Sequence, residues 1–468
     1  MSALGYIVLA CVVAGVLYCY FRPSFTLVLL MAFYPLKQLE MSYLAVFAMN
    51  SAYFNYIVFM GVCLGVLGNI TRSREAFWGY GNKFVGLLLT LYCFALLAVL
   101  YTPSREWAMD RVRDGAPYWV MQILLLPLCF SSLADVRKAI APTILACTLV
   151  VVLFLTNPKA SFYAGRLTLD IGILGVGGEA RGNPLATAQM GGHLALFAAL
   201  MLPARAAWFM HLLRLAGVFL GLGIAVAAGS RGQLAMAIIV LVAFYPMARK
   251  VKDIKQFFLF SLGFMMMAGL CVVALSYFLG QNKEQANRWD LDRWSDAMTG
   301  RSWEALRLVD AWWDSPAHWV FGLGTNAFSG ISGDQHSYAH NIFIEMLGEL
   351  GLFGLTVFLV LLTWVIKMSR ELFRTFSDDP GGRATAAVLL SQGAYLGLLA
   401  LKQGTFVSIP EPWYIWVLIA KIAMSERRHT MAYYAQHVEH SEAWAGYEEA
   451  AAAYSADVTP SSTGTATS

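Results

Sequence analysis

The chain has 468 residues, of which 58% are hydrophobic and only 13% are charged. Soluble domains carry roughly 25% charged residues, and the mean hydropathy of this chain is +0.59. The composition therefore excludes an ordinary soluble enzyme and predicts a polytopic integral membrane protein. The formal net charge of +4 is little guide to partners, because the two sides of a membrane differ in charge. We expect no nucleic-acid partner.

Apolar runs of about 20 residues, the length that crosses a bilayer, recur along the chain. The first run, Leu4 to Phe21, is expected to be a retained helix, because it lacks a basic leader and no soluble mature domain follows it. Residues 24–70 are less regular and could hold one long span with a re-entrant piece. We predict an all-α fold of about 12 transmembrane helices. The spans marked on the sequence are 4–21, 24–36, 53–70, 84–101, 117–133, 139–156, 186–203, 212–228, 233–248, 257–279, 341–366, 384–405 and 411–424.

Every second loop between these spans is rich in lysine and arginine, which is typical of the cytoplasmic side of a membrane. These basic residues are Arg72, Arg74, Lys83, Arg137, Lys138, Arg205, Arg214, Arg249, Lys250, Lys252, Lys255, Lys367, Arg370, Arg374, Arg383, Arg427 and Arg428. The opposite face is expected to be periplasmic. It holds the loops 102–116, 157–185, 229–232, 280–340 and 406–410.

The spans and loops divide the chain into four regions. Residues 1–279 form a transmembrane helical region with short loops, and residues 280–340 form a large periplasmic loop subdomain. The amphipathic stretch from Trp303 to Val309 in this subdomain is expected to be a helix that lies on the bilayer. Residues 341–424 are C-terminal transmembrane helices. Residues 425–468 are expected to form a disordered cytoplasmic tail, because they are polar and rich in Ala, Ser and Thr.

Arginines on the outward face run against the usual distribution of positive charge. Arg231 lies in the sequence GSRGQ, a short turn between two apolar helices, where a cation is costly unless it meets an anion. Arg166 and Arg181 flank a glycine-rich loop, and Arg288 opens the large loop. Because the guanidinium fork binds two phosphate oxygens at once, these four residues are candidates for binding a phosphate group. Arg301 is a supporting candidate.

Three other outward arginines are expected to pair with neighbouring acids or reach lipid headgroups. They are Arg105, Arg111 and Arg113, which alternate with Glu106, Asp110 and Asp114.

His340 and Asn341 open the apolar helix that follows the large loop. Asn341, Glu345 and Glu349 are spaced four residues apart, so they share one helical face. The helix dipole favours the neutral form of an imidazole at a helix N-terminus, which suits a general base. The alternative is a histidine that merely starts a helix capped by Asn341. His336 and His340 have the spacing of a metal pair, but no third ligand is evident and we expect no metal ion.

The pattern of His340-Asn341, nine residues, Gly351, two residues and Gly354 resembles the signature of the bacterial O-antigen ligase family. The large outward loop with GRSWEALRL and FGLGTNAFSG is similar to the setting of that signature. The sequence SRGQ at 230–233 is similar to the short Ser-Arg-Gly turn of the family. The resemblance covers roughly residues 160–410.

The resemblance implies a GT-C-type membrane glycosyltransferase of the inner membrane that acts at its periplasmic face without a nucleotide sugar, metal ion or other cofactor. Its donor would be a glycan on undecaprenyl diphosphate. A ligase would transfer this glycan to lipid A-core in lipopolysaccharide biosynthesis, with membrane lipids as its surroundings. The wider family also contains O-antigen and polysaccharide polymerases and protein O-oligosaccharyltransferases.

Polymerases resemble one another in an Arg, fifteen residues, Gly motif that occurs in two outer loops. Arg166 to Gly182 fits this motif once, and a second copy is absent. A ligase is therefore favoured, with a polymerase and a protein glycosyltransferase as alternatives.

The residue chemistry agrees with a glycosyl transfer. Arginines can stabilise the negative charge of a diphosphate leaving group, and a neutral histidine can take the proton of a sugar hydroxyl as it attacks. Direct displacement would invert the anomeric centre. A lipid-linked glycan transporter is the non-enzyme alternative, but transporters are expected to show repeated halves or broken helix pairs. An enzyme should instead gather Arg231, Arg288 and His340 at one outward cavity.

Overall fold

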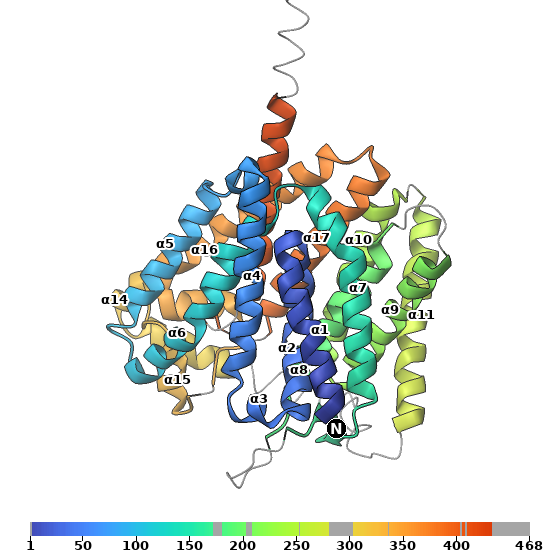
Figure 1. Ribbon diagram of the computed structural model, residues 1–468. Helices are drawn as coiled ribbons and strands as arrows, with labels where there is room; N and C mark the ends of the chain where they lie inside the picture. The colour runs from blue at the N-terminus through green and yellow to red at the C-terminus, as the bar shows by residue number, and fades with distance from the viewer. Residues whose placement is uncertain are drawn as a thin grey trace, which may run out of the picture.

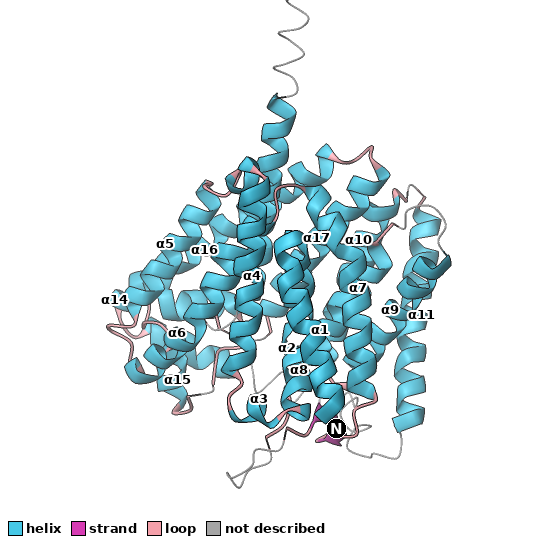
Figure 2. Cartoon of the chain, viewed as in Figure 1, coloured by secondary structure: helices cyan, strands magenta, loops and turns pink. Residues whose placement is uncertain are grey.

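The computed structural model describes residues 2–171, 180–202, 208–251, 253–279, 303–335, 337–402, 405–407 and 410–432. It is a bundle of helices, most of which run along one common direction (Figure 1). Figure 2 shows that helix dominates the described chain, with one small strand pair at the end of the bundle near the N-terminus.

The labelled helical elements are α1 (Ser2–Phe21), η1 (Pro23–Phe25), α2 (Thr26–Tyr43), α3 (Ala45–Met49), α4 (Ala52–Arg72), η2 (Arg74–Phe77), α5 (Lys83–Ala98), α6 (Arg105–Tyr118), η3 (Trp119–Leu125), η4 (Leu126–Cys129), α7 (Leu133–Leu155), α8 (Pro184–Leu200), α9 (Trp208–Ala227), α10 (Arg231–Arg249), α11 (Ile254–Leu279), α14 (Pro316–Phe321), α15 (Ala327–Ser332), α16 (Ile342–Thr375) and α17 (Pro380–Ala400). Two further helices cover residues 303–313 and 411–432. The strands are β1 (Ala160–Tyr163) and β2 (Arg166–Leu169), which pair antiparallel.

Six of the described helices are long and apolar enough to cross a membrane, which makes the chain a polytopic membrane protein. They are Ala3–Phe21, Ala52–Arg72, Leu133–Leu155, Trp208–Ala227, Arg231–Arg249 and Ile342–Thr375. The apolar helix α5 is shorter. The predicted number of about 12 spans is therefore not confirmed, although most described residues of the marked spans are helical.

Two parts of the chain differ from the sequence prediction. The region 24–70 holds two long helices, α2 and α4, joined by the five-residue helix α3, in place of one span with a re-entrant piece. The predicted loop 102–116 is mostly helix α6, which buries Ala108 and Gly115. On this helix Arg113 lies 3.7 Å from the carboxylate of Asp110, as the alternation of charges predicted.

Helix α16 is interrupted at Gly351, whose backbone has φ 68° and ψ −168°. The nine residues before the break, 342–350, follow Asn341, whose side-chain oxygen accepts from the backbone N–H of Phe343 at 2.9 Å. At the break, the N–H of Leu323 donates to the carbonyl of Gly348 at 2.9 Å, so the preceding loop pairs with the open helix end. The nine residues between Asn341 and Gly351 thus form one short helical segment, which Asn341 caps at its start and Gly351 ends.

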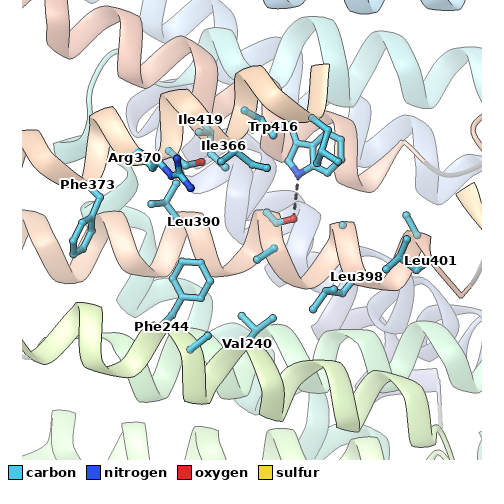
Figure 3. Close-up of a pocket in the computed structure, with 18 of the residues that line it drawn as sticks. Val240, Phe244, Ile366, Arg370, Phe373, Leu390, Leu398, Leu401, Trp416 and Ile419 are labelled. Atoms are coloured by element: carbon cyan, nitrogen blue, oxygen red, sulfur yellow. Dashed lines mark hydrogen bonds between the residues drawn. The ribbon is translucent and has the colours of Figure 1, made fainter. Parts of the chain in front are cut away.

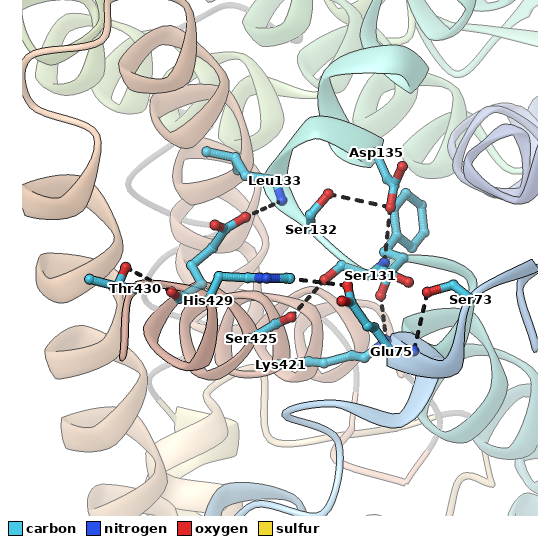
Figure 4. A network of polar contacts seen from close by, with 12 residues as sticks. Ser73, Glu75, Ser131, Ser132, Leu133, Asp135, Lys421, Ser425, His429 and Thr430 are labelled. Atoms are coloured by element: carbon cyan, nitrogen blue, oxygen red, sulfur yellow. Dashed lines mark hydrogen bonds and ion pairs between the residues drawn. The ribbon is translucent and has the colours of Figure 1, made fainter. Parts of the chain in front are cut away.

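A polar network at the end of the bundle opposite the strands fixes helix 411–432 (Figure 4). The ammonium of Lys421 donates to the carbonyl of Pro127 at 2.8 Å and also contacts the carbonyl of Phe130. The carboxylate of Glu426 accepts from the N–H of Leu133 at 2.8 Å. The contacts with Phe130 and Leu133 serve a carbonyl at the end of η4 and an amide at the start of α7. Helix 411–432 is therefore fixed to η4 and α7. This end of the bundle, which carries the basic loops predicted from the sequence, is called the basic face.

We predict that Gly351→Ala destabilises the protein. The backbone conformation at Gly351 is accessible almost only to glycine and costs roughly 1–3 kcal/mol for other residues. A Cβ atom there would also lie 2.3 Å from the carbonyl oxygen of Val320. The melting temperature in detergent should fall clearly. Gly86→Ala is the matched control, because a Cβ at Gly86 meets nothing within 4 Å. Equal melting temperatures of the two variants would contradict the assignment.

We propose that the basic face is cytoplasmic, because its loops carry the lysines and arginines. In a background without native cysteines, Val320→Cys should react with an impermeant reagent added to intact spheroplasts. Thr375→Cys, at the end of α16 on the basic face, should react only after lysis. Both positions are exposed, so accessibility of the side chain is matched. Labelling of position 375 alone from outside would reverse the orientation.

Candidate functional site

The turn between α9 and α10 carries the sequence SRGQ. Gly229 before it has a φ of 61°, a left-handed conformation that glycine adopts without strain. The hydroxyl of Ser230 contacts the side-chain oxygen of Gln233. The ammonium of Lys402, from just after α17, donates to the same oxygen at 3.0 Å. The two ends of the turn are therefore tied to each other and to α17.

Lys402 packs directly on this turn. A Cβ atom added to Gly232 would lie 2.3 Å from the Nζ of Lys402 and 2.4 Å from its Cδ. Only glycine leaves room for the lysine side chain here. The ammonium of Lys402 is thus held beside the backbone of the turn that carries Arg231.

His340 lies on the other side of Lys402. Its Nδ1 is 3.3 Å from the backbone oxygen of Lys402, and its Nε2 is 3.5 Å from the Oε2 of Glu304 in helix 303–313. A carbonyl oxygen can only accept, so the proton of the neutral imidazole is assigned to Nδ1. Nε2 is then the nitrogen that can act as a base. The ring of Tyr338 lies 4.0 Å away, centre to centre.

The structure therefore brings the segments that carry two of the predicted site residues to a common neighbour, Lys402. The turn that carries Arg231 and the loop that carries His340 are more than one hundred residues apart in the sequence, and both contact Lys402. Asn341 caps the first segment of α16, as expected for a helix-start asparagine. Arg288 and Arg301, together with His336, lie outside the described residues.

Arg166 and Arg181 lie on the strand pair. Arg166 is opposite Tyr163 in the register of β1 and β2, and the guanidinium of Arg181 lies 4.0 Å from the centre of the Tyr163 ring. Gly182 donates its N–H to the carbonyl of Leu169 at 2.9 Å. The arginine and the glycine of the Arg, fifteen residues, Gly motif therefore both lie at this hairpin. The hairpin packs against α2 and α8 through β2.

Glu345 and Glu349 share a face of α16 with Asn341, as predicted, but both are buried. Glu349 accepts from the N–H of Asn326 at 2.7 Å, and Glu345 accepts from the N–H of Phe406 at 2.6 Å. These carboxylates hold two loops against α16. Their contacts indicate a structural role next to the site.

Two residues of the site were not predicted from the sequence. Lys402 lies in the predicted span 384–405 and Glu304 in the predicted amphipathic stretch, and no site role was predicted for either. The presence of Glu304 in GRSWEALRL was a usable signal, because that segment carries part of the family resemblance. No sequence pattern marks Lys402.

An apolar groove of about 620 Å³ lies between α10, α16, α17 and helix 411–432. It begins at Ile342 and Leu401, the neighbours of the site residues, and extends to Arg370 and Arg374 near the basic face. Figure 3 shows the lining side chains along its length, from Leu398 and Leu401 at one end to Arg370 and Phe373 at the other. Such a groove suits a hydrocarbon chain whose polar end lies at the site.

The fold and site together define a polytopic membrane protein in which cationic and imidazole groups meet at one end of an apolar groove. A sequence model of the O-antigen ligase family matches residues 216–359. This segment includes the SRGQ turn, His340, Asn341 and both glycines of the C-terminal signature. The match lies within the part of the chain that carries the predicted resemblance, so the resemblance is confirmed for this segment. A comparison with curated proteins finds no match.

Proposed function

We propose that this protein is an O-antigen ligase, which transfers a polysaccharide from undecaprenyl diphosphate to a sugar hydroxyl of lipid A-core. One observation carries the proposal. The SRGQ turn and His340 both contact Lys402, beside the mouth of an apolar groove. A lipid-linked diphosphate donor needs cations for its head, hydrocarbon walls for its tail and a base for the incoming acceptor.

The groove supports the donor assignment. Its walls come from Val240, Phe244, Leu390 and Trp416, among others, and they offer dispersion contacts to an isoprenoid chain. The mouth lies beside Lys402 and the turn of Arg231, so a diphosphate on the chain would meet positive charge there. Guanidinium groups bind phosphate oxygens in pairs. Arg288 is proposed to complete this diphosphate site.

The proposed reaction is a direct displacement. The Nε2 of His340 takes the proton of the acceptor hydroxyl while the oxygen attacks the anomeric carbon. The bond from that carbon to the diphosphate oxygen breaks, and undecaprenyl diphosphate leaves with its electron pair. Arg231, Arg288 and Lys402 stabilise the charge that develops on it. The anomeric centre is inverted, and no metal ion takes part.

We place this reaction at the periplasmic face of the inner membrane and class the protein as GT-C-type. Arg166 and Arg181 remain candidates for donor binding, since the hairpin lies at the same end of the bundle as the turn between α9 and α10 (Figure 1). Arg301 remains a supporting candidate in the large loop. The described residues 303–335 and 337–340 would then form part of the outward cover of the site.

A polymerase of lipid-linked repeat units is the second candidate, favoured by the Arg166 to Gly182 spacing. A protein O-oligosaccharyltransferase would use the same donor chemistry. A lipid-linked glycan transporter is less well supported, because base and cations meet at one end of the bundle.

Arg231→Lys should severely impair transfer. The lysine keeps the charge but loses the fork that binds two phosphate oxygens. The measurement is glycan transfer in membranes with equal protein levels. Arg105→Lys serves as the control, since Arg105 lies on the exposed side of α6 and should tolerate the change. Arg288→Lys is expected to match Arg231→Lys. Full transfer by Arg231→Ala would remove this residue from the proposed site.

His340→Ala should abolish detectable transfer while the protein still folds and binds the lipid-linked donor. Loss of a general base typically costs about 10²–10⁴-fold in rate. Wild-type activity should fall at low pH as the imidazole takes up a proton, and a chelator should have no effect. His336→Ala is the control, because a metal pair would make both histidines equally important.

Near-normal turnover of His340→Ala, or loss of wild-type activity with a chelator, would exclude the base role. Lost donor binding would instead make His340 a phosphate ligand. The lipids that accumulate in a strain carrying His340→Ala separate the two candidate functions. Long polymer on the carrier with unmodified core indicates a ligase, whereas a single repeat unit on the carrier or core indicates a polymerase.

A further inference from the structure

His340 is held between an acceptor on each side of its ring. The backbone oxygen of Lys402 faces Nδ1 at 3.3 Å, and a carboxylate oxygen of Glu304 faces Nε2 at 3.5 Å. The side chain of His340 is only 21% exposed and that of Glu304 is 43% exposed. The contact is therefore partly screened from water, which strengthens the electrostatic effect of the carboxylate on the ring.

The position of Glu304 is fixed by the packing of its helix. Its neighbour Ala305 is buried, and Leu308, one turn later, is fully buried. A Cβ atom on Gly348 would lie 2.4 Å from the Cγ of Leu308, so this helix rests closely on the first segment of α16. Arg307 also donates to the carbonyl of Ile331 at 3.0 Å. Helix 303–313 is thus docked on the same segment that His340 precedes.

We propose that Glu304 is a positioning residue that acts through His340. The carbonyl of Lys402 keeps one proton on Nδ1, and the carboxylate of Glu304 favours the uptake of a second proton at Nε2, which makes Nε2 a stronger base. This inference rests on the proposed function and deepens it, because it assigns a partner to the proposed base.

The charge balance of the reaction explains what this partner does. When the acceptor hydroxyl gives its proton to Nε2, the neutral imidazole becomes an imidazolium, and the carboxylate of Glu304 stabilises the new positive charge. The separation of 3.5 Å is longer than an ordinary hydrogen bond. A hydroxyl can therefore reach Nε2 without first displacing a tightly bound carboxylate.

Other groups around the ring act more weakly or in the opposite sense. The ammonium of Lys402 is directed away from His340, to the side chain of Gln233. The phenol of Tyr338 belongs to the same loop and lies against the ring face. Among the residues that the structure describes, Glu304 is the acid that faces Nε2, so its removal should make His340 harder to protonate.

The test is a titration of His340 by NMR in isotope-labelled, full-length protein in nanodiscs, with His340→Ala to assign the signal. The ring nitrogen shifts should report a proton on Nδ1. In Glu304→Gln the titration midpoint should move to lower pH by about one unit, since an opposite charge within 4–6 Å favours the protonated form. Asp310→Asn is the matched control on the exposed side of the same helix and should leave the midpoint unchanged.

Transfer assays give a second measurement. The acid limb of the pH–rate profile of Glu304→Gln should move to lower pH with the titration. Its maximal rate should fall by less than the about 10²–10⁴-fold expected on removing the base.

An unchanged midpoint and acid limb in Glu304→Gln would overturn the inference, even if the rate fell, because a purely structural role predicts that result. A failure of the proposed function looks different. In that case His340→Ala would keep its transfer activity, while the NMR midpoint of the otherwise wild-type protein would still respond to Glu304→Gln.

Discussion

The break of α16 at Gly351 is the constraint on which the geometry of the site depends. A helix that stops inside a membrane protein leaves carbonyls that water and lipid cannot satisfy. Here the segment before the break offers the carbonyls of Gly348 and Glu349, and these accept from the N–H groups of Leu323 and Gly324. The outer loop is thereby fixed to α16. The short helix that follows His340 is held at a set depth and angle as a result.

Two buried glutamates on α16 hold further parts of the loops against this helix. Glu345 and Glu349 are 1% and 5% exposed, and burial of such groups is costly unless hydrogen bonds satisfy them. Their partners are backbone N–H groups of Asn326 and Phe406, and a typical hydrogen bond contributes about 0.5–1.5 kcal/mol net. Apolar packing adds little between helices in lipid. Polar bonds to the backbone therefore explain better than hydrophobic burial why the loops stay beside His340.

The parts of this structure that follow from local pattern were predictable from the sequence. Hydrophobic length located the helices, alternation of charged loops separated the two faces, and the His340-Asn341 signature located the start of α16. The break at Gly351 was not predicted, because an apolar helical pattern continues through it. The positive φ and the close approach of Val320, which together require glycine, arise only in the fold. Lys402 was missed because its role depends on a contact with Gln233 across 169 residues.

The polar bonds that fix the loops and helix ends also help to distinguish an enzyme from a transporter. A transporter must open its site alternately to both sides, whereas here both ends of the bundle are tied by polar bonds. The Lys421 and Glu426 contacts hold the basic end, and the junction at Lys402 joins α10, α17 and the loop of His340 at the other. Between them the groove is lined by side chains suited to hydrocarbon. A carrier lipid could keep its chain in this groove while its diphosphate meets fixed cations, so reaction at the site requires no passage across the membrane.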